Sequence, residues 1–317
     1  MIGHARLVGK TEEKESLMRI ALFPGQGAIK PGMGLAWKDH PSGQLFDQIG
    51  EISGINVRHL VEMADGPELV RTDNAQLATF AISMVVADAI ALSDVDLAIG
   101  HSLGEYSALT FAGILDLESA TRLVLQRGQA MERASRQNPG SMVAVLGADP
   151  EVLQGVLEKF TTLVIANQNA PGQSVIAGSS EELNALRLGA KEFGLRKVLP
   201  LDVGGAFHSP LMAPAQDPLE EALNDTIFLD GHIPVVANIN ATSQQGGDLW
   251  RVLLLAQLTG AVRYQESIER LPEGPHEFVE LGPGSVLIGL VKRMRADATL
   301  TAISTPQDVL DYRGNPT

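Results

Sequence analysis

Gly100-His101-Ser102-Leu103-Gly104 forms a G-x-S-x-G pattern, which could present a serine hydroxyl for nucleophilic attack. A strand-like run at 95–99 precedes the pattern, and a helix-like run begins at Glu105. Strand, sharp turn and helix in this order predict a nucleophile elbow. Glycine suits such a turn because it has no Cβ to collide with nearby backbone. The helix start would direct N–H groups and its positive dipole end toward Ser102.

A serine hydroxyl needs a base that removes its proton, and two of the seven histidines are candidates. His208 follows two glycines in a segment whose backbone could direct a side chain into a cleft. His276 lies near the C-terminus, where α/β-hydrolases carry their base, and Asp225 or Asp230 could orient it. Spacing alone does not separate the two histidines.

A long helical pattern over 117–135 places Leu123, Arg127 and Met131 on one face. An arginine between two apolar residues of a buried stripe needs a partner, unless its stem lies on the core and its head reaches water. The pattern therefore allows two interpretations of Arg127, an ordinary surface-reaching side chain or a buried cation that needs a partner.

The apolar periodicity predicts an α/β fold, with strands at 19–23 and 95–99 and helices at 35–49, 75–91 and 117–135. Between 138 and 203 the order changes to βαββαβ, with strands at 141–146, 163–167, 174–177 and 195–199 and helices at 150–159 and 181–193. A strand at 233–237, a helix at 248–258 and a strand at 277–280 follow.

These elements predict a large α/β-hydrolase-like domain made of residues 19–137 and 204–317. A small ferredoxin-like (βαββαβ) subdomain, residues 138–203, is expected to be inserted into it. Residues 1–18 are polar and charged and predict a flexible N-terminal extension without the apolar core of a secretory signal.

Composition narrows the class of protein. The chain has 317 residues and a formal net charge of −14, which argues against nucleic acid as a partner. No apolar run approaches the roughly 20 residues that cross a bilayer, so no membrane span is predicted. The chain has no cysteine, which excludes thiol catalysis and fits a cytoplasmic location. The histidines show no metal-ligand spacing, so no metal site is expected.

Seven short motifs occur in an order and spacing that resemble the malonyl-CoA:acyl-carrier-protein transacylase family, over nearly all of the chain from Ile20 to about Ala302. They are Phe23-Pro24-Gly25-Gln26-Gly27, Gly100-His101-Ser102-Leu103-Gly104-Glu105-Tyr106, Arg127-Gly128, Asn169-Ala170-Pro171-Gly172-Gln173, Gly205-Ala206-Phe207-His208-Ser209, Gln257-Leu258-Thr259 and Gly282-Pro283-Gly284. Free-standing acyltransferases that serve polyketide synthases in trans share the pattern, so it does not separate fatty-acid from polyketide synthesis.

The resemblance implies a ping-pong malonyl transfer through an acyl-enzyme. Ser102 would be the nucleophile and His208 the base, oriented by an amide or main-chain carbonyl near Gln257 rather than by an aspartate. Gln26 and the N–H of Leu103 would form the oxyanion hole.

The resemblance also implies which residues bind substrate. Arg127 matches the arginine that binds the free carboxylate of malonate, as a planar guanidinium can do in a bidentate fork. Phe207 matches a position where a bulky aromatic accompanies malonyl over methylmalonyl preference, and His101 and Asn169 would contact substrate. The implied substrate is malonyl-CoA, with no bound cofactor.

The implied partners are a coenzyme A thioester and an acyl carrier protein. Such carriers are acidic, so docking on this acidic chain would need a local basic patch. Two clusters are candidates, Lys191 with Arg196 and Lys197, and Lys292 with Arg293 and Arg295. Alternative functions are an acyl hydrolase of the same family, which would clear acyl groups with water, and a serine esterase of α/β-hydrolase type, which would require His276.

Overall fold

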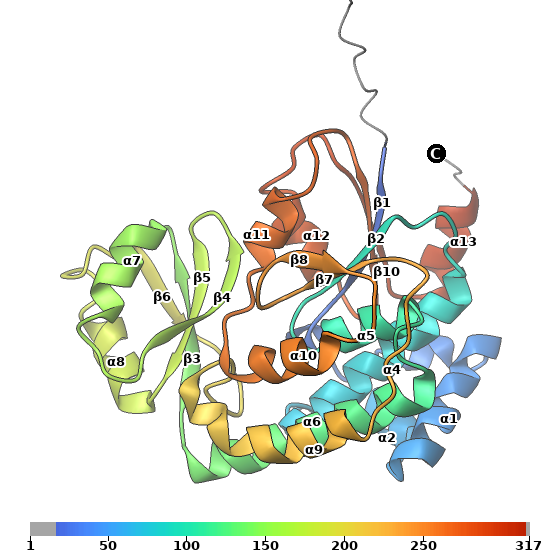
Figure 1. Cartoon of the computed structure of the whole chain (residues 1–317), viewed down its shortest axis with the longest axis horizontal. Coiled ribbons are helices and arrows are strands. Elements are labelled where there is room, and N and C mark those ends of the chain that lie inside the picture. The colour runs from blue at the N-terminus through green and yellow to red at the C-terminus, as the bar shows by residue number, and fades with distance from the viewer. Residues whose placement is uncertain (1–16, 315–317) are drawn as a thin grey trace, which may run out of the picture.

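Two β-sheets organise the chain, a six-stranded sheet in a larger unit and a four-stranded sheet in a smaller one (Figure 1). The computed structural model describes residues 17–314. Most of the predicted N-terminal extension, residues 1–18, lies outside the described residues. Within residues 17–314 no helix is long and apolar enough to cross a membrane.

The larger sheet has the strand order β10-β9-β1-β2-β7-β8, and all neighbours are parallel except β7 and β8. Its strands are β1 (Arg19–Phe23), β2 (Leu97–Gly100), β7 (Val235–Ala237), β8 (Thr242–Gln244), β9 (Glu277–Leu281) and β10 (Thr299–Ile303). The central strands β1, β2 and β7 are largely apolar because parallel sheets are covered on both faces. Ala21 and Phe23 of β1 face one buried cluster, and Ile20 and Leu22 face another.

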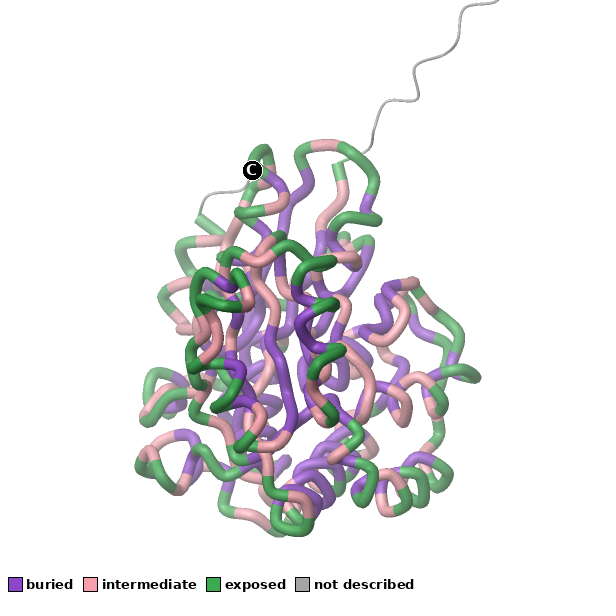
Figure 2. Tube along the Cα trace, turned by 90° about the vertical axis from the view of Figure 1, so that its left-hand side faces the viewer, coloured by how far each residue is buried: buried purple, intermediate pink, exposed green. Residues whose placement is uncertain are grey.

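Helices cover both faces of this sheet (Figure 1). They are α1 (Gln44–Ser53), α2 (Val57–Glu62), α3 (Gly66–Leu69), α4 (Thr72–Ile90), α5 (Gly104–Phe111), α6 (Leu117–Gln137), α9 (Gln216–Asn224), α10 (Trp250–Thr259), α11 (Tyr264–Glu269), α12 (Val286–Val291) and α13 (Pro306–Gly314). Buried stretches run through the interior and exposed ones along the outside (Figure 2). Asp116 caps α6 by accepting the N–H of Ser119 at 2.7 Å.

The smaller unit contains β3 (Ser141–Leu146), α7 (Pro150–Leu157), β4 (Val164–Ala170), β5 (Gln173–Gly178), α8 (Ser180–Leu188) and β6 (Lys197–Pro200). Its antiparallel sheet has the order β4-β5-β3-β6 and an apolar core of its own. Strand β4 also binds the larger unit, because the N–H of Gln168 donates to the carbonyl of Val262 at 2.9 Å. That junction brings the polar end of β4 toward the serine turn.

The predicted helix over 35–49 is wrong. Residues Leu35–Trp37 and Pro41–Gly43 form two short 3₁₀ helices, and the α-helix α1 begins only at Gln44. Pro41 explains the break, because its ring disfavours helical backbone at the preceding residue, and His40 is extended. The helical periodicity on either side of Pro41 was real, but it belonged to separate elements.

Candidate active site

Ser102 lies in a sharp turn between β2 and α5, as the G-x-S-x-G pattern predicts. Its φ is +54°, a left-handed conformation that a residue other than glycine rarely adopts. The two flanking glycines allow a close approach of backbone. A Cβ on Gly100 would overlap the main chain of Gly104, and a Cβ on Gly104 would overlap the carbonyl oxygen of Phe23. The turn is therefore packed directly against the end of β1.

Gly104→Ala is expected to lower the free energy of unfolding by about 1–3 kcal/mol or more, because the new methyl group must displace rigid backbone of β1. Chemical denaturation monitored by circular dichroism measures the change. Gly155→Ala is the matched control, since Gly155 lies within α7 and an added Cβ there would meet no atom within 4 Å, so alanine should stabilise slightly. Equal stability of the two variants would contradict the close packing of the turn.

His208 is the histidine that contacts Ser102, with 2.7 Å between Ser102 Oγ and His208 Nε2. His208 Nδ1 lies 2.8 Å from the main-chain carbonyl oxygen of Gln257. A carbonyl only accepts, so Nδ1 carries the proton and Nε2 is free to accept the serine proton. Burial, and then the positive charge of Arg127, lower the pKa of His208 to about 3. His208 also has a positive φ, 55°, so both partners are held in uncommon backbone conformations.

His276, the alternative base, does not contact Ser102. Its Nδ1 accepts the N–H of Met18 at 3.2 Å, and its Nε2 lies 2.9 Å from the carbonyl of Pro272. Asp230 accepts the N–H of Gly247, and Asp225 lies at the end of α9, so neither aspartate orients His276. The arrangement that a serine esterase with His276 requires is therefore contradicted by the structure.

Arg127 is fully buried, which excludes the surface-reaching interpretation of its stripe. Its Nη2 donates to Ser102 Oγ at 3.2 Å and to Gln257 Oε1 at 2.9 Å, and its Nη1 donates to Gln76 Oε1 at 2.6 Å. The guanidinium also lies 5.4 Å from the ring centre of Tyr106. Burial lowers the pKa of Arg127 from its usual value, but a guanidinium remains charged at neutral pH.

Three residues of the site were missed from the sequence: Asn238, Glu105 and Gln76. Asn238 fixes the serine turn, because its Oδ1 accepts the N–H of Ser102 and its Nδ2 donates to the carbonyl of Gly100, both at 2.7 Å. A signal existed for Asn238, since it directly follows β7, and the carboxyl ends of parallel strands meet at one edge of the sheet. Gln76 lies in α4, and no sequence pattern identifies it as a residue of the site.

A cavity of about 250 Å³ opens beside Ser102 and His208. Gln26, Phe207 and His101 line it, as predicted for residues near the substrate, and apolar side chains such as Met131 and Val203 complete it. Asn167 lines this cavity, whereas Asn169 is not among its lining residues. Asn169 lies behind it, with Oδ1 2.9 Å from His101 Nε2.

The N–H of Leu103 has no acceptor among the described residues, whereas the N–H of Ser102 is already bound by Asn238. The N–H of Leu103 precedes α5, at the positive end of the helix dipole. Gly25 packs against the same turn, since a Cβ there would lie 2.8 Å from the carbonyl oxygen of His101. This contact keeps the segment of Gln26 next to Ser102.

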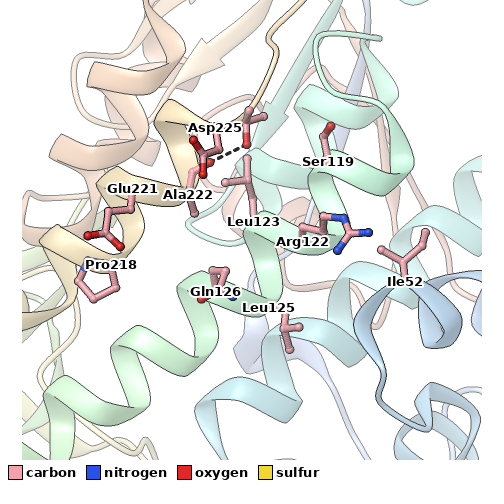
Figure 3. A pocket seen from close by; sticks show the side chains of 11 residues that line it. Ile52, Ser119, Arg122, Leu123, Leu125, Gln126, Pro218, Glu221, Ala222 and Asp225 are labelled. Carbon is pink, nitrogen blue, oxygen red and sulfur yellow. Dashed lines mark hydrogen bonds between the residues drawn. The ribbon is translucent and has the colours of Figure 1, made fainter.

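A second cavity of about 410 Å³ lies away from Ser102, between α6 and α9 near α1 (Figure 3). Arg122, Gln126, Glu221 and Asp225 contribute polar groups to it. None of the residues around Ser102 lines this cavity, so it is separate from the candidate active site.

The two basic clusters proposed for carrier docking differ in exposure. Arg295 is buried and donates to the carbonyls of Ile268 and Leu271, so it is wrongly included in a surface patch. Lys292 and Arg293 are exposed, and Arg293 also bonds the carbonyl of Pro171 at 2.9 Å in the smaller unit. In the other cluster, Lys191, Arg196 and Lys197 are all exposed.

An α/β sheet that presents a serine, a neutral histidine and a buried arginine together defines a site of the serine acyl-transfer class. Comparison with known proteins agrees: the sequence model of the acyl transferase domain family matches residues 21–303. The chain belongs to this acyl transferase family, and its resemblance to malonyl-CoA:acyl-carrier-protein transacylases is confirmed.

Relatives and solved structures match over almost their full lengths. The malonyl CoA-acyl carrier protein transacylase of Bacillus subtilis is 38% identical over 297 residues, covering 91% of this chain and 94% of the relative. The crystal structure of acyl-carrier-protein S-malonyltransferase from Bartonella henselae has a TM-score of 0.87 at 31% identity, covering 94% of this chain and 99% of the other. The malonyl-CoA:ACP transacylase structure of Synechocystis has a TM-score of 0.86 at 34% identity, covering 93% and 100%.

Proposed function

We propose that this protein transfers a malonyl group from coenzyme A, through an ester on Ser102, to the phosphopantetheine thiol of an acyl carrier protein. The observation that carries the proposal is the buried guanidinium of Arg127, 3.2 Å from Ser102 Oγ. A cation buried beside a nucleophile favours an acyl group that carries its own carboxylate. The names of the relatives support the same donor and acceptor.

In the first half-reaction, Ser102 Oγ attacks the thioester carbonyl while His208 Nε2 takes the hydroxyl proton. The N–H of Leu103 and the segment of Gln26 would stabilise the oxyanion, and loss of one such donor typically costs about 2.7–4 kcal/mol of transition-state stabilisation. The carbon–sulfur bond then breaks, and the proton passes from His208 to the sulfur of coenzyme A.

In the second half-reaction, the thiol of the carrier's phosphopantetheine gives its proton to His208 Nε2. Its sulfur bonds to the malonyl carbonyl carbon, and the ester bond to Ser102 Oγ breaks. His208 then returns the proton to Ser102 Oγ, so the enzyme is regenerated and no net proton is released. We propose that the acidic carrier binds a surface of exposed basic residues, which are Lys191, Arg196, Lys197, Lys292 and Arg293.

We also propose a fold type for each of the two units and a role for Phe207. Mostly parallel strands covered by helices support an α/β-hydrolase-like domain of residues 19–137 and 204–317. The order of elements between 138 and 203, together with the antiparallel sheet order, supports an inserted ferredoxin-like subdomain. Phe207, which lines the cavity, is proposed to limit space beside the malonyl methylene.

Intact-protein mass spectrometry tests the proposed function. After brief mixing with malonyl-CoA, we expect one malonyl adduct, which peptide mapping assigns to Ser102. The adduct should discharge onto a holo acyl carrier protein, faster at low salt than at high salt because of charge attraction. An adduct that water removes as fast as it forms would instead support the acyl hydrolase alternative, and no adduct on Ser102 would refute acyl transfer.

A further inference from the structure

Glu105 is a buried carboxylate next to the reacting groups, with 1% of its surface exposed. One of its oxygens, Oε1, accepts the main-chain N–H of Asn238 at 2.7 Å. The other, Oε2, accepts from Nε2 of Gln257 at 2.6 Å. Both oxygens are therefore occupied by N–H donors, and neither is in direct contact with Arg127.

The side-chain amide of Gln257 lies between this carboxylate and the guanidinium of Arg127. Its Nε2 donates to Glu105 and also to the main-chain carbonyl of Ser102 at 2.9 Å. Its Oε1 accepts from Arg127 Nη2 at 2.9 Å. An ionised carboxylate only accepts hydrogen bonds, so the amide must turn its NH₂ end toward Glu105 and its oxygen toward Arg127.

We propose that Glu105 is a positioning residue that gives the enzyme its selectivity for acyl groups with a free carboxylate, by fixing the orientation of the Gln257 amide that holds Arg127. This inference rests on the proposed malonyl transfer. Glu105 does not touch the acyl group and acts through Gln257.

The indirect contact explains how a buried cation stays available for substrate. Were Glu105 paired directly with Arg127, it would compete with the incoming carboxylate. Through the amide it supplies a nearby negative charge while the guanidinium keeps unused capacity, since Arg127 Nε is buried without a partner among the described residues. Burial raises the pKa of Glu105 to about 8, although its two N–H donors and then the charge of Arg127 lower it. Both oxygens accept N–H groups here, which is the contact pattern of the ionised carboxylate.

Replacing Glu105 with glutamine keeps the shape and changes only the pattern of donors and acceptors. If the side-chain oxygen at position 105 faces the N–H of Asn238, the NH₂ group of that side chain faces the NH₂ group of Gln257. Rotating the Gln257 amide by half a turn relieves that conflict, but it then directs NH₂ at Arg127 and oxygen at the carbonyl of Ser102. Every arrangement therefore leaves a buried polar group without a hydrogen-bond partner. The arrangement in which the side chain at position 105 is fully paired loses the hydrogen bond between Gln257 and Arg127.

The test measures initial rates of Ser102 acylation by malonyl-CoA and acetyl-CoA, followed by mass spectrometry, in the native chain and variants. Glu105→Gln is expected to slow malonyl loading about 10- to 100-fold and to lower the malonyl-to-acetyl ratio about 10-fold, because an acetyl group needs no cation. Gln257→Met, which keeps the main-chain carbonyl at His208, should lower the ratio similarly. The double variant should lower it little further, since both changes break one chain of contacts.

Glu280→Gln is the matched control. Glu280 is equally buried, and its carboxylate accepts the N–H groups of Leu287 and Ile288 at the start of α12, away from Ser102. This variant should lose stability but keep the malonyl-to-acetyl ratio.

An unchanged ratio in Glu105→Gln, or a double variant whose loss equals the product of the two single losses, would overturn the inference while native malonyl loading stands. Absence of malonyl loading in the native chain would refute the proposed function itself. Should Glu105→Gln not fold, the ratio in Gln257→Met decides, because an unchanged value there excludes any action of Glu105 through the amide.

Discussion

Arg127→Met is expected to slow acylation of Ser102 by malonyl-CoA about 10²–10⁴-fold and to slow acylation by acetyl-CoA far less. Hydrogen bonds to charged groups contribute about 1.5–3 kcal/mol each, and a bidentate carboxylate loses two of them. Each 1.4 kcal/mol corresponds to a factor of ten in rate. Methionine keeps much of the length and apolar stem, so the cavity retains its shape. Initial rates with the two thioesters, measured as adduct mass on Ser102, check the prediction.

Arg122→Met is the control, because Arg122 lies on the same helix, is exposed and, within residues 17–314, pairs only with Glu118 in a contact of small energetic value. It should leave both rates unchanged. A loss of equal size for malonyl and acetyl in Arg127→Met would contradict carboxylate recognition. It would mean that Arg127 mainly holds Ser102 and Gln257 in place.

The candidate catalytic residues could be predicted because they lie in short sequence motifs. The G-x-S-x-G pattern and the strand and helix that flank it are sufficient to predict the turn that holds Ser102. His208 could not be separated from His276 by spacing, because the two positions are equally compatible with a polar loop. The family resemblance favoured His208, and the structure brings its Nε2 within 2.7 Å of Ser102 Oγ.

The position of Asn238 after a strand places it at the edge of the sheet, but the pairings of the supporting contacts could not be predicted, since they join residues far apart in sequence. Asn238 reaches the serine turn across 136 positions, and Gln257 reaches Glu105 across 152. No local periodicity records such a pairing. Asn167 could not be singled out for another reason, because β4 is irregular between Ile165 and Ala170 and simple alternation does not describe its side-chain directions.

Arg127 and His208 are coupled through charge. The cation of Arg127 is the second largest cause of the low pKa of His208, after burial. A bound malonyl carboxylate neutralises that cation, so we expect the substrate to strengthen the base that deprotonates Ser102. A neutral acyl group lacks this effect. We therefore expect selectivity for malonyl to arise both from binding at Arg127 and from the basicity of His208.

His208→Ala is expected to slow malonyl loading of Ser102 about 10²–10⁴-fold, the usual contribution of a positioned general base. His276→Gln is the matched control, because His276 is also buried but, in the described part of the chain, bonds only main-chain groups away from Ser102. It should keep the native loading rate. Initial rates of adduct formation distinguish the two variants, and equal losses would contradict the assignment of His208 as base.

The pH dependence of malonyl loading by the native enzyme should reflect the low pKa of His208. Only neutral His208 can accept the serine proton, and with a pKa of about 3 it stays neutral as pH falls from 7 to 5. Protonation of His208 should therefore not lower kcat/KM for malonyl loading over this range, where a histidine of ordinary pKa, about 6.5, would lose roughly 20- to 30-fold. In Arg127→Met the missing cation raises the pKa of His208, so any decline should begin at a higher pH. A native profile that falls with a midpoint near 6.5 would contradict the buried, cation-flanked base.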